Sequence, residues 1–183
     1  MKLLGISGSI RKESYNTKLL HAAAQCLPEG VSLTVIDCGN LPLYNNDFDK
    51  EVKPEAVARL LQLIGECDGL LIATPEYNYS IPGVLKNGID WASRPGYKSV
   101  LAKKPAAIVS AAKSAIGGAR VQLHLRDVFS STLTPVVPSP PFLVPMAQDK
   151  FDKSGGLVDD STRSRLERYM KDFVEWVERL TVS

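Results

Sequence analysis

Residues 5–16 read Gly5-Ile6-Ser7-Gly8-Ser9-Ile10-Arg11-Lys12-Glu13-Ser14-Tyr15-Asn16. They follow a hydrophobic run at residues 2–6 and precede an amphipathic run that starts near Thr17, so they join the carboxyl end of a first strand to the amino end of a first helix. Backbone N–H groups and the positive end of the helix dipole converge at such a junction. Together with small hydroxyl side chains and one arginine, they suit a phosphate monoester and predict a phosphorylated cofactor.

The rest of the chain continues this alternation of strand and helix. A first strand at residues 3–6 is followed by alternating residues 31–35, which predict a half-buried strand near a sheet edge. Fully apolar runs predict buried strands at residues 69–74 and 105–110, and a short fifth strand is expected at 136–137, ahead of a proline-rich excursion over 138–156. Helical spacing predicts helices at residues 17–27 (with Ser14 or Asn16 as cap), from 54, at 84–92, after Gly117-Gly118, and at 162–180.

Five strands alternating with five helices predict a doubly wound α/β fold. For a chain of 183 residues, a flavodoxin-like parallel sheet of five strands in the order 2-1-3-4-5, with helices on both faces, fits better than the six-stranded dinucleotide-binding order. We expect a single domain over residues 1–183.

The composition argues against several classes of protein. The chain has 22 basic and 20 acidic residues, a net charge of +2, and no basic surface pattern with interleaved aromatic residues, so we expect no nucleic-acid partner. Cys26, Cys38 and Cys67 form no Cys-x-x-Cys pair, so neither a disulfide framework nor a metal site is expected. The chain opens directly on a strand, and no apolar run approaches the ~20 residues that span a bilayer. We therefore expect a cytoplasmic protein without a membrane partner.

In a sheet of this order, ligands bind outside the carboxyl ends of the strands where the order reverses, which places residues 7–16 beside residues 74–82. In the first loop, Ser9, Ser14 and Asn16 can donate hydrogen bonds to phosphate oxygens, and Arg11 adds a charged fork. The sequence patterns of triphosphate loops, dinucleotide loops and phosphatase thiolate loops are all missing from this segment. The alternative is an ordinary polar turn with a Ser or Asn cap.

The second loop reads Thr74-Pro75-Glu76-Tyr77-Asn78-Tyr79-Ser80-Ile81-Pro82-Gly83. Two tyrosines beside an amide supply stacking area and directed hydrogen bonds, which suit a planar heteroaromatic ring. The two prolines stiffen the loop. The alternative is a rigid connector whose tyrosines pack on the next helix.

Two motifs resemble the signatures of the NADPH-dependent FMN reductase family: Gly8-Ser9-x-Arg11-x-x-Ser14-x-Asn16 and Pro75-Glu76-Tyr77-Asn78-x-Ser80-x-Pro82-Gly83-x-Leu85-Lys86-Asn87-x-Ile89-Asp90-Trp91-x-Ser93. The resemblance extends over nearly the whole chain in element order. Its nearest branch is similar to the bacterial quinone and chromate reductases, which are related to small azoreductases. It implies a flavodoxin-like fold, non-covalently bound FMN, NAD(P)H as the hydride donor, and dimers or tetramers with FMN near the subunit interface.

Carried over by motif position, the resemblance assigns Ser9, Ile10, Arg11, Ser14, Tyr15 and Asn16 to the FMN phosphate, and Pro75, Glu76, Tyr77, Asn78 and Tyr79 to the ring and ribityl chain. A third region, residues 110–120, contributes Ala112, although relatives often carry Ser and Gly where this chain has Ala112 and Ser114. Backbone amides near Ala112 and the Asn78 side chain are the candidate donors to the reduced ring. Gly117-Gly118 is either a plain helix entry or a ligand contact.

The flavin itself carries the redox chemistry, so no side chain is expected to act as a catalytic acid or base. The leading hypothesis is an FMN-dependent NAD(P)H oxidoreductase that reduces quinones, free flavins, azo compounds or chromate. A flavodoxin-type electron carrier is the alternative, but such carriers are usually strongly acidic and this chain is not. A flavin-free scaffold is disfavoured because both loops are intact. Trp91 is a candidate for contact with a neighbouring subunit.

Overall fold

The computed structural model describes residues 1–181. Its strands form one parallel sheet in the order β2-β1-β3-β4-β5, which confirms the predicted topology. The strands are β1 (Lys2–Ser7), β2 (Ser32–Asp37), β3 (Gly69–Ala73), β4 (Ala106–Ala111) and β5 (Phe142–Val144). The α-helices are α1 (Tyr15–Gln25), α2 (Glu55–Glu66), α3 (Gly83–Ala92), α4 (Ala119–Ser131) and α5 (Asp160–Thr181), with short 3-10 turns at Asn46–Phe48, Gly96–Lys98 and Ala147–Asp149.

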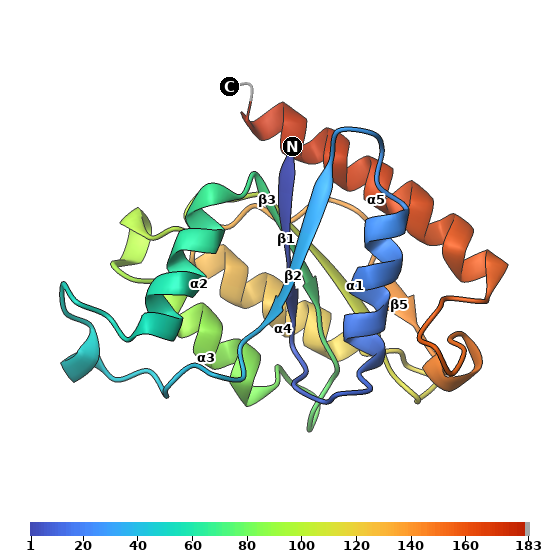
Figure 1. Ribbon diagram of the computed structural model, residues 1–183, viewed down its shortest axis with the longest axis horizontal. Coiled ribbons are helices and arrows are strands. Elements are labelled where there is room, and N and C mark those ends of the chain that lie inside the picture. Colours follow the sequence, from blue (N-terminus) through green and yellow to red (C-terminus); the bar gives the residue numbers. More distant parts are fainter. Residues whose placement is uncertain (182–183) are drawn as a thin grey trace.

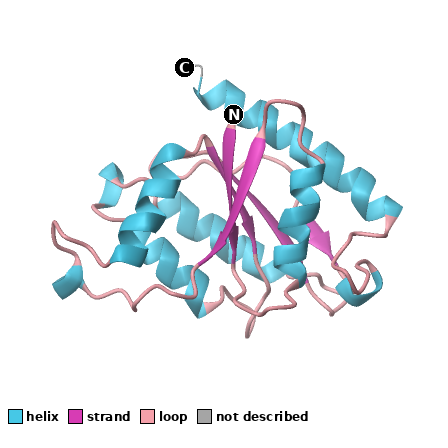
Figure 2. Ribbon diagram, in the orientation of Figure 1, coloured by secondary structure: helices cyan, strands magenta, loops and turns pink. Residues whose placement is uncertain are grey.

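Helices cover both faces of the sheet, as Figures 1 and 2 show. α1 and α5 share one hydrophobic core with the sheet, in which Leu19 and Phe173 join Leu71 of β3. α2, α3 and α4 build the second core on the opposite face, where Phe129 joins Ile72, the next residue along β3. Successive β3 side chains therefore serve different cores, which explains why this strand is apolar at every position.

The fifth strand is where the sequence prediction was wrong. Val136 forms an isolated bridge with Ala106, but the continuous strand is Phe142–Val144, which pairs with the end of β4. Three prolines at residues 138–141 lack the N–H group that a ladder needs, so pairing resumes only at Phe142. The predicted excursion over residues 138–156 therefore contains the edge strand.

This interruption leaves Ile108, in the middle of β4, between the bridge and the strand. The Tyr169 hydroxyl from α5 takes the missing strand's place: it donates to the Ile108 carbonyl oxygen at 2.9 Å and accepts from the Ile108 N–H at 3.3 Å. Burial raises the pKa of Tyr169 to about 12. The neutral phenol thus satisfies both backbone groups of a buried strand residue.

Side-chain caps fix where two helices begin. α1 starts at Tyr15 because the Ser14 hydroxyl accepts from the Thr17 N–H at 3.3 Å, which confirms one of the two predicted caps. α5 starts at Asp160, earlier than predicted, because the Asp159 carboxylate accepts from the N–H and hydroxyl groups of Thr162 at 2.8 and 2.6 Å. These hydrogen bonds, with a further one from a lysine, hold the pKa of Asp159 at about 2.

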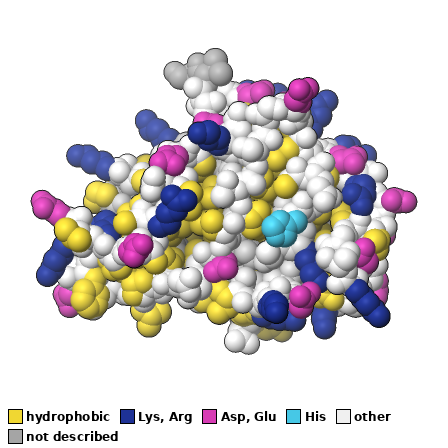
Figure 3. Space-filling view, in the orientation of Figure 1, with side chains coloured by type: hydrophobic (Ala, Val, Ile, Leu, Met, Phe, Trp, Pro, Cys, Tyr) yellow, Lys and Arg dark blue, Asp and Glu magenta, His cyan; other side chains and the backbone are white. Residues whose placement is uncertain are grey.

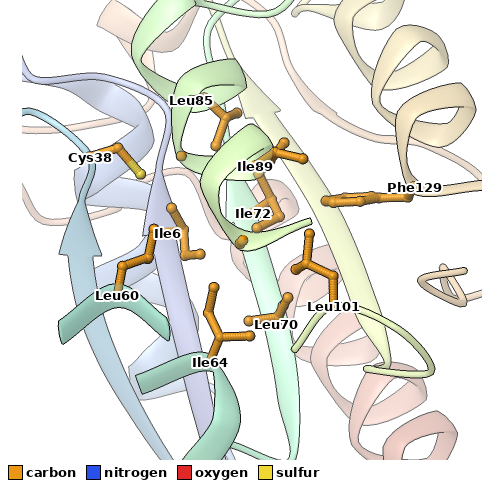
Figure 4. Close-up of a pocket in the computed structure, with 12 residues that line it drawn as sticks. Ile6, Cys38, Leu60, Ile64, Leu70, Ile72, Leu85, Ile89, Leu101 and Phe129 are labelled. Atoms are coloured by element: carbon orange, nitrogen blue, oxygen red, sulfur yellow. The ribbon is translucent and has the colours of Figure 1, made fainter. Parts of the chain in front are cut away.

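A narrow cavity lies in the core between the sheet and helices α2 and α3 (Figure 4). Apolar side chains such as Ile6, Leu60 and Ile89 surround it, together with the thiol of Cys38. Burial raises the pKa of Cys38 to about 12, so this thiol is a packing group and not a nucleophile. An apolar void of this kind has no hydrogen-bond donors for a phosphate, so it does not suit the predicted phosphorylated cofactor.

Trp91 is also part of the interior, and the expectation that it reaches a neighbouring subunit was wrong. The side chain is completely buried, its Nε1 donates to the Pro42 carbonyl oxygen at 2.8 Å, and its ring meets Tyr44 edge-on. Trp91 thus anchors the long loop after β2. Within residues 1–181, none of the helices is both long and apolar enough to cross a bilayer.

Candidate functional site

The loops that follow β1, β3 and β4 lie at the lower edge of the molecule in Figure 1. A pocket opens between these loops, at the carboxyl ends of the three strands. The pocket is open to solvent at its mouth. Its lining includes residues expected there, namely Ser9, Arg11, Ser14, Tyr15, Asn16, Pro75, Glu76, Tyr77 and Ala112, together with Ala111 and Lys113. The two loops at the reversal of strand order therefore meet in one pocket, as the topology predicts.

The first loop presents hydroxyl groups and a cation to this pocket. Ser9 and Ser14 are buried, and their oxygens accept from the backbone N–H groups of Arg11 and Thr17. Each hydroxyl proton remains available to a ligand oxygen. Arg11 is exposed, and within residues 1–181 no carboxylate lies within ion-pair distance of its guanidinium. This combination has the chemistry of a phosphate cradle.

Asn16 has a structural task that the sequence did not reveal. Its side-chain amide donates to the Ala111 carbonyl oxygen at 3.0 Å and accepts from the Ala111 N–H at 2.9 Å. Both residues are buried. Asn16 therefore fastens the first turn of α1 to the end of β4, and this pair of bonds fixes the loop after β1 relative to the rest of the pocket.

A second fastening joins the first loop to the end of β3. The Gly8 N–H donates to the Ala73 carbonyl oxygen at 2.7 Å, and a Cβ atom on Gly8 would lie only 2.5 Å from the Thr74 hydroxyl. The chain therefore needs glycine here because the two loops approach so closely.

The second loop is a tight hairpin held in a strained conformation. Tyr77 and Ser80 exchange both backbone hydrogen bonds, and the two residues between them, Asn78 and Tyr79, have φ angles of 49° and 65°. This is a two-residue turn of the kind that normally prefers Asn-Gly, so the tyrosine is in a costly backbone region. Its ring is covered by the Arg120 guanidinium at 4.3 Å, a stacking contact that offsets part of that cost.

Glu76 ties this hairpin to α4. Its carboxylate accepts from the N–H groups of Arg120 and Val121 at 3.0 and 3.2 Å and from the Arg120 guanidinium at 3.2 Å. The negative charge thus sits on the N-terminus of α4, where the helix dipole favours it. Glu76 therefore fixes the geometry of the loop in addition to lining the pocket. The Ser80 hydroxyl adds a hydrogen bond of 3.0 Å to His124 on the same helix.

In the third loop, which follows β4, the backbone amide of Ala112 does not have the expected role of a donor to the ligand. The Ala112 N–H donates to the Val144 carbonyl oxygen at 3.1 Å, so this amide is not available to a ligand. Gly118 caps α4 with a φ of 84°, and a Cβ atom there would lie 2.9 Å from Ser110. The Gly117-Gly118 pair is therefore a helix entry, one of its two anticipated roles.

Three predicted residues lie outside the lining of the pocket. Ile10 is 58% exposed, and its side chain lies against Gly39 in the loop after β2. Asn78 and Tyr79 occupy the tip of the hairpin, and Tyr79 is 64% exposed. They stand at the rim of the site and not on its wall. Among residues 1–181, no three His, Cys, Asp or Glu side chains gather as metal ligands would.

Comparison with known proteins agrees with this geometry. A family profile described as NADPH-dependent FMN reductase matches residues 1–149. The chain is 41% identical over 177 residues to a 2-hydroxy-1,4-benzoquinone reductase from a Burkholderia species, which covers 97% of this chain and 96% of that one. The chain belongs to the NADPH-dependent FMN reductase family. Within the family it is also 43% identical over 180 residues to an NAD(P)H-dependent FMN reductase from Pseudomonas aeruginosa, covering 98% and 97% of the two chains.

The whole fold of this FMN reductase family member is also similar to that of a solved structure. The flavoenzyme NAD(P)H:(acceptor) oxidoreductase FerB from Paracoccus denitrificans superposes with a TM-score of 0.89 at 32% identity, covering 97% of each chain. Ala111 and Lys113, which also line the pocket, belong to the third region predicted at residues 110–120, from which Ala112 alone was assigned to the cofactor. Ala111 is the last residue of β4 and Lys113 lies two residues beyond it, so their place at the carboxyl end of a central strand was the available signal.

Proposed function

We propose that this member of the FMN reductase family is an FMN-dependent NAD(P)H oxidoreductase that reduces quinones or similar small acceptors. The observation that carries the proposal is the pocket in which the loops after β1, β3 and β4 converge. Its relatives named as quinone and FMN reductases support the assignment of the activity.

The residues of the pocket fit FMN. The hydroxyls of Ser9 and Ser14, the N-terminus of α1 and the unpaired Arg11 match a dianionic phosphate. Tyr77 and Pro75 present flat apolar surface to a planar ring. When bound, FMN supplies the redox chemistry by accepting two electrons from NAD(P)H and passing them to the acceptor.

The protein's own part is to bind, to orient and to stabilise charge. With the Ala112 amide engaged by β5, the backbone N–H of the neighbouring Lys113 becomes the candidate to stabilise negative charge at the ring edge. Asn16 and Glu76 act as positioning residues, because each fastens one ligand-binding loop to a different element.

We further propose that the protein is cytoplasmic and works as a homodimer or homotetramer. In support, Leu43, Phe48 and Val52 of the loop after β2 and Tyr97 after α3 are all more than half exposed. Figure 3 shows apolar side chains gathered at the lower left, where the loop of residues 39–53 lies. Exposed apolar groups of this extent are typical of surfaces that another protein covers.

An absorption spectrum tests the function. The protein loaded with FMN should be yellow, should bleach when NADH or NADPH is added without oxygen, and should regain its colour when a benzoquinone follows. A yellow protein that neither nucleotide bleaches would favour the electron carrier. A colourless protein that cannot be loaded with FMN would reject both flavin functions.

A further inference from the structure

A second pocket adjoins the proposed FMN site on the phosphate side. The two share Arg11, Tyr15 and Lys113 in their linings. The second pocket continues past these residues to Lys18 on α1 and to Phe151 and Lys153 in the segment before α5. A group attached to a phosphate in the first pocket would therefore extend from that pocket into the second one.

The far wall of this second pocket is a well-formed turn. Phe151 and Leu157 form a bridge, and the Asp152 carboxylate between them accepts from the Ser154 hydroxyl at 2.7 Å and from the Gly156 N–H at 2.9 Å. The aliphatic part of Lys18 packs against the same turn, so that α1 and the turn support each other. The wall is thus an ordered turn, from which the exposed Lys153 side chain projects.

The charge of the second pocket is unbalanced in favour of cations. Its two carboxylates are already engaged: Glu13 pairs with Lys18 at 2.8 Å, and Asp152 accepts the hydrogen bonds within its turn. In the described part of the chain, Arg11, Lys113 and Lys153 have no carboxylate within 4.0 Å. These three side chains can therefore neutralise an added anionic group without breaking an existing ion pair.

Aromatic surface lies beside these cations. The rings of Tyr15 and Phe151 pack with their centroids 5.8 Å apart, and the ammonium group of Lys18 stands 5.6 Å from the Tyr15 ring. Tyr15 is only partly buried and lines both pockets, whereas Phe151 is buried beneath the turn. Aromatic surface next to unpaired cations is a combination that suits a purine nucleotide.

We propose that the second pocket binds the adenosine monophosphate half of FAD, so that the protein accepts FAD as well as FMN. The inference rests on the proposed placement of the flavin phosphate between Ser9, Ser14 and Arg11. The second phosphate of FAD then lies among Arg11, Lys113 and Lys153, and the adenine lies against the aromatic surface at Tyr15. The same adenosine phosphate chemistry occurs in NAD(P)H, and the two sources are separated by experiment.

The test uses the apoprotein, titrated with FMN and with FAD while flavin fluorescence is followed. We expect FAD to bind within about tenfold of FMN. Lys153→Ala should weaken FAD about threefold to tenfold, as expected for one solvent-exposed ion pair, and should leave FMN within about twofold. Lys171→Ala, which removes an exposed lysine from α5, is the matched control and should change neither affinity.

Three results would overturn the inference in different ways. If FAD binds far more weakly than FMN, or if Lys153→Ala binds FAD as tightly as wild type does, the second pocket does not bind the adenosine half of FAD, and the FMN site is unaffected. If Lys153→Ala raises the KM for NADPH in the FMN-loaded enzyme and leaves FAD affinity unchanged, the adenosine half belongs to the dinucleotide and not to FAD. If FMN itself does not bind the apoprotein, the proposed function fails together with this inference.

Discussion

Removing the side-chain amide of Asn16 should both destabilise the fold and weaken the cofactor. In Asn16→Ala the N–H and C=O groups of Ala111 lose their partners in a site where both residues are at most 3% exposed. Each buried backbone group left unpaired costs about 1–3 kcal/mol. Partial relaxation toward the open pocket reduces the sum, so we expect a loss of about 2–4 kcal/mol in the free energy of unfolding.

The chain offers a matched control for this change. Asn87 on α3 also uses its side-chain amide to bridge backbone groups, accepting from the Tyr44 N–H at 2.7 Å and donating to the Pro42 carbonyl oxygen at 3.0 Å. It does not line the pocket. Asn87→Ala should cost about 1–3 kcal/mol because the Pro42 oxygen keeps its bond from Trp91.

Urea unfolding of the two apoprotein variants, followed by tryptophan fluorescence, gives the stabilities, and titration with FMN gives the affinities. Relative to wild type, the FMN dissociation constant should rise at least about fivefold more in Asn16→Ala than in Asn87→Ala, a difference of about 1 kcal/mol in binding free energy. An Asn16→Ala protein of wild-type stability would refute the assigned hydrogen bonds. Equal effects of both variants on FMN would refute the claim that Asn16 positions the phosphate loop.

Two further changes probe contacts outside the phosphate loop. Tyr169→Phe leaves both backbone groups of Ile108 unpaired and should cost about 2–3 kcal/mol near neutral pH. The pKa of Tyr169 in the folded protein is about 12, above the ordinary value of 10.0, so the stability that its hydroxyl contributes is complete below pH 10 and is lost as the pH rises toward 12. The difference in unfolding free energy between wild type and Tyr169→Phe, measured in urea, should therefore close over that range. A difference that stays constant would contradict this account. Glu76→Gln removes the charge from the N-terminus of α4 and should cost about 0.5–2 kcal/mol while weakening FMN measurably in the same titration; unchanged FMN affinity would show that the α4 contact does not hold the hairpin in place.

The sequence was sufficient for the sheet and for the location of the site. Apolar residues on both faces of β3 and β4 identified the central strands, and the count of strands with their helices gave the order. The position of both loops at the reversal of strand order followed from that topology alone. The one misplaced strand was β5, because residues 136–137 have the apolar pattern of a strand and the prolines that follow them are typical of a strand's end.

The contacts that hold the site together were beyond the sequence because they join distant segments. The partner of Asn16 is 95 residues away, and the partner of Glu76 is 44 residues away. Residue type identifies each as polar and located in a binding loop, and a direct role toward the ligand is then the simplest hypothesis. Only the packed structure shows that the Asn16 amide bonds both backbone groups of Ala111, that the Glu76 carboxylate is bonded to Arg120 and Val121, and that the Ala112 N–H is bonded to β5.

The most direct test of the central claim compares FMN with riboflavin, which lacks the phosphate, in Arg11→Ala. A charge-assisted contact to phosphate is worth about 1.5–3 kcal/mol, so FMN should bind about tenfold to a hundredfold more weakly than in wild type. Riboflavin should bind within about twofold of its wild-type affinity. Lys12→Ala, which removes the adjacent exposed cation that does not line the pocket, should change neither ligand. Equal losses for FMN and riboflavin in Arg11→Ala would contradict the assignment of the loop after β1 as the phosphate site.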